Sequence, residues 1–179
     1  MLDKELSADL ERYLLLNYRP EGAEEKHFAE DTHKKAGVFF PLVGMAGIFR
    51  ILQGTDSLVR HLDMSFSEKL MWWIKERKRT PVEIYRAAGV TKAHFAKIRN
   101  NPQYHPTKET VLAFVIALHL TLEEAKDLLE RAGYALSKSH LGDMIVKCFL
   151  EMQRYNIDEI NEALYIHECK PLTNWRESK

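Results

Sequence analysis

Apolar residues recur at every third or fourth position along much of this chain, a spacing that predicts amphipathic helices. In the first such stretch, Leu2–Tyr18, the apolar positions include Leu6, Leu10 and Leu14, with acidic and basic residues between them. The sequence RPEG at positions 19–22 has the proline and glycine of a helix end. We therefore expect one N-terminal helix, followed by a polar loop with a short helical piece over 23–36.

The next stretch, Gly37–Leu62, is dense in apolar residues but interrupted by glycines and by Pro41. Each glycine weakens a helix by about 1 kcal/mol. The pattern favours an irregular pair of helices over a short strand hairpin. Its most apolar part stops at Arg50 and is too short to span a bilayer, so we expect no membrane segment.

From position 65 the helix signals are sharper, because the pattern Ser/Thr-x-x-Glu occurs at 65–68, 80–83 and 121–124. In such a capping box the hydroxyl and the carboxylate bond the free amides at a helix start. Pro81 occupies the first helical position, where its missing N–H is harmless. Together with the apolar spacing, these signals predict helices over about 66–77, 81–88, 91–99, 107–118 and 121–132.

Within this five-helix unit, Gly89 is expected to turn the chain between the second and third helices, and Gly133 to end the fifth. We expect Ile84, Ala87 and Ala88 to face inward. Phe95 and Ile98 are spaced for the core side of the third helix.

Two more helices are expected over about 139–154 and 157–167, before a tail, KPLTNWRESK, that should be frayed unless Trp175 docks. The predicted fold class is therefore all-α. We divide the chain into an N-terminal extension (1–63), a five-helix domain (64–134), a C-terminal helical extension (135–170) and a tail (171–179).

The charges are segregated although the whole chain is neutral, with 26 basic and 26 acidic residues. Positions 75–108 carry nine basic and two acidic residues, a net charge of about +7, whereas 121–168 carry ten acidic and five basic residues. A local basic block of this kind suits nucleic acid, although solvation of an exposed helix face is the plainer explanation.

Candidate chemistry is sparse. Cys148 and Cys169 are too few for a disulfide framework and suggest a reducing cytoplasmic location, with Cys148 as a buried thiol. The acidic N-terminus does not resemble a secretion signal. No phosphate-binding loop or nucleophile elbow occurs, and His27 and His33 do not have the spacing of a metal set. We expect neither enzyme activity nor a cofactor or bound metal.

The stretch from Thr80 to Tyr134 resembles the helix-turn-helix domain of the Cro and phage-repressor type, often called the XRE family. The match lies in the turn RAAGVT at 86–91, in the pair Phe95 and Ile98, in Pro106-Thr107, and in the pattern LAFVIALHLTLEE at 112–124. It covers about 70 residues, at roughly 65–134. The resemblance implies a bacterial or phage transcription regulator that binds double-stranded DNA selectively as a homodimer, with the third helix (about 91–99) in the major groove.

By the same resemblance, the residues that face base edges are Thr91, Lys92, Ala93, His94 and Lys97. The expected phosphate contacts are Arg86, Arg99, Asn100, Asn101, Gln103, Tyr104, Lys108, Lys78 and Arg79. The plainer alternative for Tyr85 and Tyr104 is half-buried packing.

Two other functions stay open. Many members of the family carry a glutamine just inside the second helix, where this chain has Pro81-Val82. This departure and the neutral total charge favour a protein-interaction adaptor, such as an antitoxin or a defence inhibitor, that docks a partner through residues 1–62. RNA is the third possibility, because Lys, His and Arg can also follow phosphates without reading bases.

Overall fold

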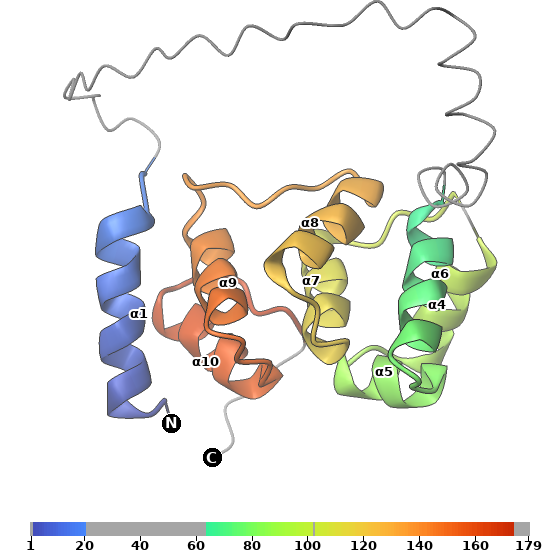
Figure 1. The fold of residues 1–179 in the computed structure, drawn as a ribbon, viewed down its shortest axis with the longest axis horizontal. Helices are drawn as coiled ribbons and strands as arrows, with labels where there is room; N and C mark the ends of the chain where they lie inside the picture. Colours follow the sequence, from blue (N-terminus) through green and yellow to red (C-terminus); the bar gives the residue numbers. More distant parts are fainter. Residues whose placement is uncertain (1, 21–63, 102, 174–179) are drawn as a thin grey trace, which may run out of the picture. The chain divides into compact units, whose positions relative to one another are not determined.

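The computed structural model describes residues 2–20, 64–101 and 103–173, and all regular structure within them is helical (Figure 1). The helices are α1 (Lys4–Asn17), α4 (Phe66–Glu76), α5 (Pro81–Ala87), α6 (Lys92–Asn100), α7 (Lys108–Ala117), α8 (Leu122–Arg131), α9 (Leu141–Glu151) and α10 (Ile157–Ile166). The all-α prediction is confirmed for this part of the chain. The expectations for 23–36 and for Gly37–Leu62 fall outside the described residues.

The helices begin where the sequence places a cap. All three predicted capping boxes form, at the starts of α4, α5 and α8. The hydroxyl groups of Thr91 and Thr107 accept the amides of residues three positions ahead and so start α6 and α7. Gly89 and Gly133 both have positive φ, at 62° and 76°, as expected for residues that end a helix in the left-handed conformation.

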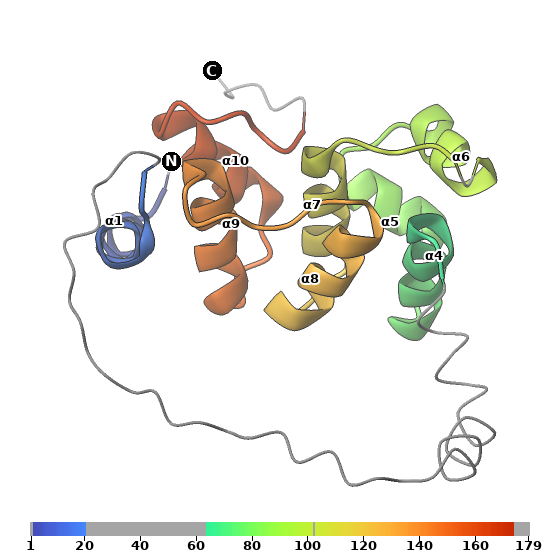
Figure 2. The same ribbon diagram turned by 90° about the horizontal axis from the view of Figure 1, so that it is seen from above.

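Helix α7 forms the centre of the core. Every residue from Thr110 to Ile116 is buried, and the helix packs against α5, α8 and α10. A helix that is apolar on all sides must be surrounded by other elements. It therefore separates α4, α5 and α6 at one end of this unit from α9, α10 and α1 at the other (Figures 1 and 2).

Helix α1 packs on α9 through Leu6, Leu10 and Leu14 and belongs to the same compact unit as α4–α10. The described part of the N-terminal extension thus packs on the rest of this unit through α1, while the division into domains drawn from the sequence stays a prediction. None of the described helices is long and apolar enough to cross a membrane.

A cluster of ion pairs and rings joins α4 to α8. Lys69 lies 3.1 Å from Asp127, and Arg77 lies 2.6 Å from Glu124. The Lys69 ammonium also lies over the neighbouring ring of Trp72, 4.7 Å from its centroid. Although burial alone would raise the pKa of Asp127, hydrogen bonds from Arg131 and Lys69 hold it below its ordinary value. The first helix of the five-helix unit is therefore fixed to the last.

Two expectations about packing are wrong. Ala87 is exposed rather than inward-facing, because Ile84 is the only buried residue in the last turn of α5. Ala88, directly after the helix, is buried as expected. The tail is not frayed over 170–173, since Leu172 is only 7% exposed. Trp175 lies outside the described residues.

Candidate nucleic-acid interface

The connection between α5 and α6 is a tight turn, Ala88–Thr91, in which only one residue needs a left-handed backbone. Gly89 supplies it, and a Cβ atom built there would lie 2.9 Å from Thr173 Cγ2. Glycine is required at this position both for φ and for the close approach of another segment. After this turn, α6 lies at the edge of the unit, at the end away from α1 (Figure 2).

Helix α6 has one buried and one exposed face. Phe95 and Ile98 are buried at 4% and 1% exposure, and Phe95 packs edge-on against Phe114 of α7. On the opposite face, Lys92, Ala93 and Lys97 are exposed. Their side chains are therefore accessible with respect to the described parts of the chain.

Tyr104 organises two of the predicted base-facing side chains. Its hydroxyl lies 3.1 Å from His94 Nε2, and the Lys97 ammonium lies 4.4 Å from the centroid of its ring. His94 and Tyr104 are both half-buried. The Lys97 ammonium is thus held over the Tyr104 ring, whereas one ring nitrogen of His94 is engaged in a contact within the protein. Thr91 likewise uses its hydroxyl oxygen to accept the amide of His94, at 3.2 Å.

Most of the predicted phosphate contacts are exposed side chains close to α6 in the chain. The exposed ones are Lys78, Arg79, Arg86, Arg99, Asn100, Asn101 and Gln103. Arg79 lies 3.5 Å from Glu83, and the Arg99 Nε donates to Asn100 Oδ1 at 3.1 Å. The Asn101 Oδ1 accepts the amide of Gln103 at 3.0 Å, which shapes the connection that follows α6.

Lys108 differs from the other predicted phosphate contacts. Its amine lies 2.5 Å from Asp143 Oδ2, on α9, and its side chain is only 26% exposed. This ion pair crosses from the start of α7 to α9, so the amine is engaged within the fold. Its role as a phosphate contact remains a prediction, but it is the weakest of the set.

Glu83, one of the two acidic residues inside the basic block, is already engaged within the fold. Glu83 accepts the backbone amide and the hydroxyl of Thr80 in the α5 capping box, and these bonds, with Arg79, hold its pKa below the ordinary value. Its negative charge therefore offsets Arg79 locally.

Cys148 is fully buried and unpaired, as expected, and burial raises the pKa of its thiol to about 12. Among the described residues, no cluster of histidine, cysteine, aspartate or glutamate could hold a metal ion. His27 and His33 lie outside them.

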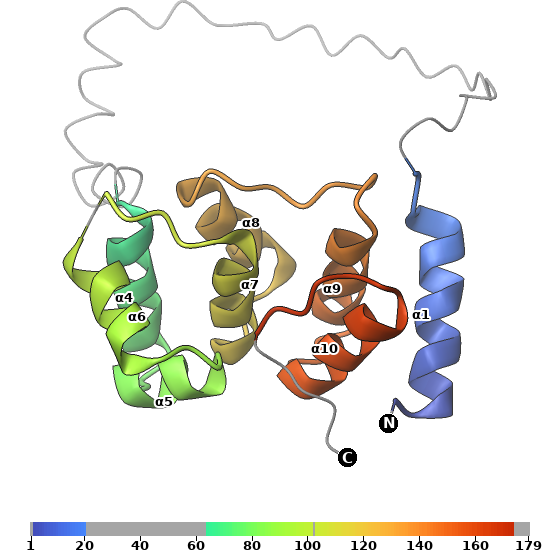
Figure 3. The same cartoon turned by 180° about the vertical axis from the view of Figure 1, so that it is seen from behind.

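A segment that the sequence interpretation missed supports the α5–α6 turn. After α10 the chain runs back to α7 (Figure 3), and Asn161 of α10 holds it with both amide atoms. The Asn161 Oδ1 accepts the Leu172 amide at 2.8 Å, and its Nδ2 donates to Thr173 Oγ1 at 2.9 Å. We name residues 169–173 the C-terminal strap. The only sequence signal was an asparagine on the apolar face of α10, between Ile160 and Ala163.

Comparison of the chain with family models, with curated proteins and with solved structures gives no match. The site is therefore interpreted from its own geometry.

Proposed function

We propose that this protein is a sequence-selective, double-stranded-DNA-binding regulator in which α5, the Gly89 turn and α6 act as a helix-turn-helix of the Cro and phage-repressor type. The observation that carries the proposal is the two-sided character of α6. Phe95 and Ile98 anchor one face in the core, while Lys92, Ala93 and Lys97 extend from the other.

This face has the chemistry that a major groove accepts. An α-helix fits the width of the groove, and residues near the start of the second helix of the motif meet base edges. The lysine ammonium groups can donate to guanine acceptors, and the Ala93 methyl can contact a thymine methyl. Tyr104 holds Lys97 in place before binding, which lowers the ordering cost of the contact.

The surrounding side chains can supply the sequence-independent part of binding. Phosphate contacts fix the register of a protein on the duplex and make affinity depend on salt. Arg86, Arg99 and the Lys78–Arg79 pair are exposed and belong to the block with a net charge of about +7. Among the acidic residues of 121–168, Glu124 and Asp143 pair with Arg77 and Lys108 of the block, whereas Lys92 and Lys97 are exposed on α6. Neutrality of the whole chain therefore does not oppose the proposal.

Selective recognition by one short helix favours a homodimer, because two copies can read half-sites one duplex turn apart. Helix α1 and the apolar stretch 37–62 are the candidates for the contact between copies. In this proposal the protein acts in the cytoplasm without a cofactor.

The experiment is a fluorescence-anisotropy titration of labelled duplex DNA at low salt with wild type and two charge-reversal variants. The test variant is Lys92→Glu with Lys97→Glu. The control is Lys126→Glu with Lys138→Glu, which makes the same charge change at exposed positions away from α6. We expect the test variant to lose at least about tenfold in affinity, and the control much less.

Equal losses in the two double variants would show a non-specific charge effect and contradict a role for α6. Competition by duplex RNA as strong as by duplex DNA would favour RNA as the target instead.

A second candidate function, a protein-interaction adaptor, is favoured by one observation. Leu15 and Leu16, at the end of α1, are 85% and 76% exposed, and adjacent exposed leucines are unusual on a surface that contacts only water. If the adaptor is correct, Leu15→Lys with Leu16→Lys abolishes co-purification of a stoichiometric protein partner, and the wild type shows no salt-dependent DNA binding.

A further inference from the structure

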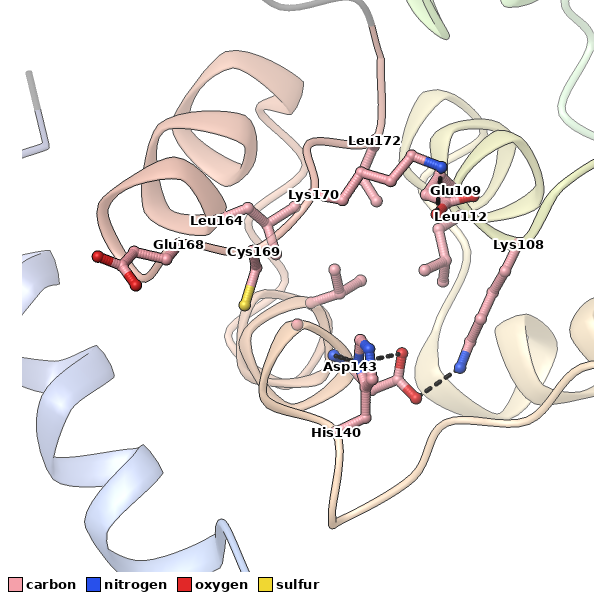
Figure 4. A pocket seen from close by; sticks show the side chains of 12 residues that line it. Lys108, Glu109, Leu112, His140, Asp143, Leu164, Glu168, Cys169, Lys170 and Leu172 are labelled. Atoms are coloured by element: carbon pink, nitrogen blue, oxygen red, sulfur yellow. Dashed lines mark hydrogen bonds and ion pairs between the residues drawn. The ribbon is translucent and has the colours of Figure 1, made fainter. Parts of the chain in front are cut away.

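A hollow of about 360 Å³ lies on the side of the C-terminal strap that faces α9 (Figure 4). The starts of α7 and α9, the end of α10 and the strap enclose it. Its volume is at the low end of the range for small-molecule sites. Apart from Lys108, the residues of the proposed DNA contact do not line it.

The inner lining of the hollow is apolar. Leu112 of α7, Val146 of α9, Leu164 of α10 and Leu172 of the strap all line it. A hydrocarbon body that replaces water against these side chains gains about 25 cal/mol for each Å² of apolar surface buried. The lining therefore selects a ligand with an apolar body.

The carboxylates at the rim are already engaged. The Asp143 side chain is 3% exposed, and its Oδ2 accepts the Lys108 amine at 2.5 Å and the Ser137 amide at 2.8 Å. Glu109 lies 2.9 Å from the Lys170 amine. The remaining acid, Glu168, turns its carboxylate away from the hollow in Figure 4.

The groups at the rim that can still form hydrogen bonds are donors. Each lysine ammonium has three N–H groups, so Lys108 and Lys170 keep N–H groups beyond the one that meets a carboxylate. The His140 Nδ1 lies 3.3 Å from the Asp143 amide and 3.4 Å from Asp143 Oδ1, so this ring nitrogen is engaged within the protein. The two lysines can therefore donate to a ligand in the hollow, and that ligand must supply acceptors.

We propose that this hollow is a binding site for a small molecule with an apolar body and a single carboxylate group. The carboxylate accepts from Lys170 and Lys108, and the body lies against the four apolar side chains of the lining. A carboxylate is favoured over a neutral acceptor because hydrogen bonds between charged partners are about twice as strong.

The position of the hollow makes such a ligand an effector, a step that rests on the proposed DNA binding. Lys170 and Leu172 line the hollow, and the next residue, Thr173, is the one that touches the Gly89 turn. A ligand that moves or fixes the strap therefore acts on Thr173, which lies against the Gly89 turn that leads into α6.

The test uses the full chain, with hexanoate and phenylacetate as probes and their neutral amides, hexanamide and phenylacetamide, as matched controls. Titration calorimetry measures binding without DNA, and methyl NMR shows whether the shifts fall on Leu112, Val146, Leu164 and Leu172. The variant Lys170→Gln removes one ammonium group at an exposed position. Lys147→Gln, on α9 and paired with Glu151, is the control outside the hollow.

We expect at least one carboxylate to bind, its amide to bind at least about tenfold more weakly, and Lys170→Gln to reduce affinity by about tenfold while Lys147→Gln does not. Absence of binding by both carboxylates at millimolar concentration, equal binding of the amides, or shifts at other methyl groups would overturn the site.

The effector role has its own readout, the affinity for DNA with and without saturating carboxylate. We expect a change of at least about threefold. An unchanged affinity with a filled hollow would overturn the coupling and leave the site standing. If no DNA binds at all, the proposed function fails and the coupling fails with it, whereas calorimetry still decides the site.

Discussion

At the residue scale, the properties of α6 depend on a few contacts that sequence spacing alone does not reveal. Phe95 and Ile98 were predictable as core residues because their period matches the helix. The bond from His94 to Tyr104, and the ring beneath Lys97, depend on where the chain returns after α6. The sequence could therefore supply candidate site residues, which stay a prediction, but not the contacts that their side chains make.

Substitution of Tyr104 tests this ranking. Tyr104→Phe keeps the ring beneath Lys97 and frees His94, so we expect DNA affinity to change by less than about twofold. Tyr104→Leu also removes the ring, whose attraction for an ammonium at an exposed site is about 0.5–1 kcal/mol, so we expect a loss of about two- to fivefold. Anisotropy titration of the two variants measures this, and equal affinity of Leu and wild type would show that the ring does not position Lys97.

The two cysteines should differ in reactivity. Burial raises the pKa of Cys148 to about 12 and also raises that of Cys169, which is half-buried. Since the thiolate is the nucleophile and Cys148 is fully buried, iodoacetamide should modify Cys169 first in the native protein and both after denaturation. Mass spectrometry of a time course measures this. Equal native rates would mean that Cys148 is accessible.

The raised pKa of Cys148 makes the stability of the fold depend on pH. The native thiol of Cys148 stays protonated above its ordinary pKa of 9.0, whereas the unfolded chain releases the proton there. Its contribution to stability is therefore complete below pH 9.0 and is lost as the pH rises through about 12.

At the element scale, the helix starts could be predicted because capping is local chemistry. A hydroxyl and a carboxylate three residues apart satisfy amides that no other part of the chain reaches, so the three boxes identify α4, α5 and α8 without tertiary information. Expectations about packing were less secure. The prediction that Ala87 faces inward was wrong because a seven-residue helix buries little more than one position per turn. The prediction of a frayed tail was wrong over the strap because the residue that holds it, Asn161, is on another helix.

Removal of one cap measures what these signals contribute. Thr121→Ala leaves the amide of Glu124 without its side-chain acceptor at the start of α8 and should cost about 1 kcal/mol. For a chain of this length that corresponds to a fall of about 2–4 °C in Tm. Thr121→Ser keeps the oxygen and is the matched control. Thermal unfolding followed by circular dichroism gives both values, and equal losses would show that the methyl group, not the cap, stabilises α8.

At the scale of the whole molecule, the C-terminal strap joins elements that are distant in the chain. Asn161 is completely buried on α10, and the residues that it holds lie against the α5–α6 turn. No local pattern reports such a contact, which is why the sequence predicted a frayed tail there.

Loss of the Asn161 amide should loosen the strap and weaken the fold. Asn161→Ala leaves the buried Leu172 amide without its acceptor, a cost of about 1–3 kcal/mol. Thr173→Val removes only the half-buried hydroxyl and should cost less. Denaturant unfolding of the two variants measures the free energies of unfolding. A Thr173→Val loss equal to or larger than that of Asn161→Ala would contradict a strap held chiefly through Leu172.

The segregation of charge is the other whole-molecule property, and it bears on the central claim that α6 reads a DNA duplex. The most direct test is binding of the wild-type protein to a pool of random-sequence duplexes across a salt series, with sequencing of the bound fraction. The account predicts binding that weakens steeply as salt rises and one enriched motif that is lost in the Lys92→Glu, Lys97→Glu variant. No binding at the lowest salt, or binding without any enriched sequence, would contradict it.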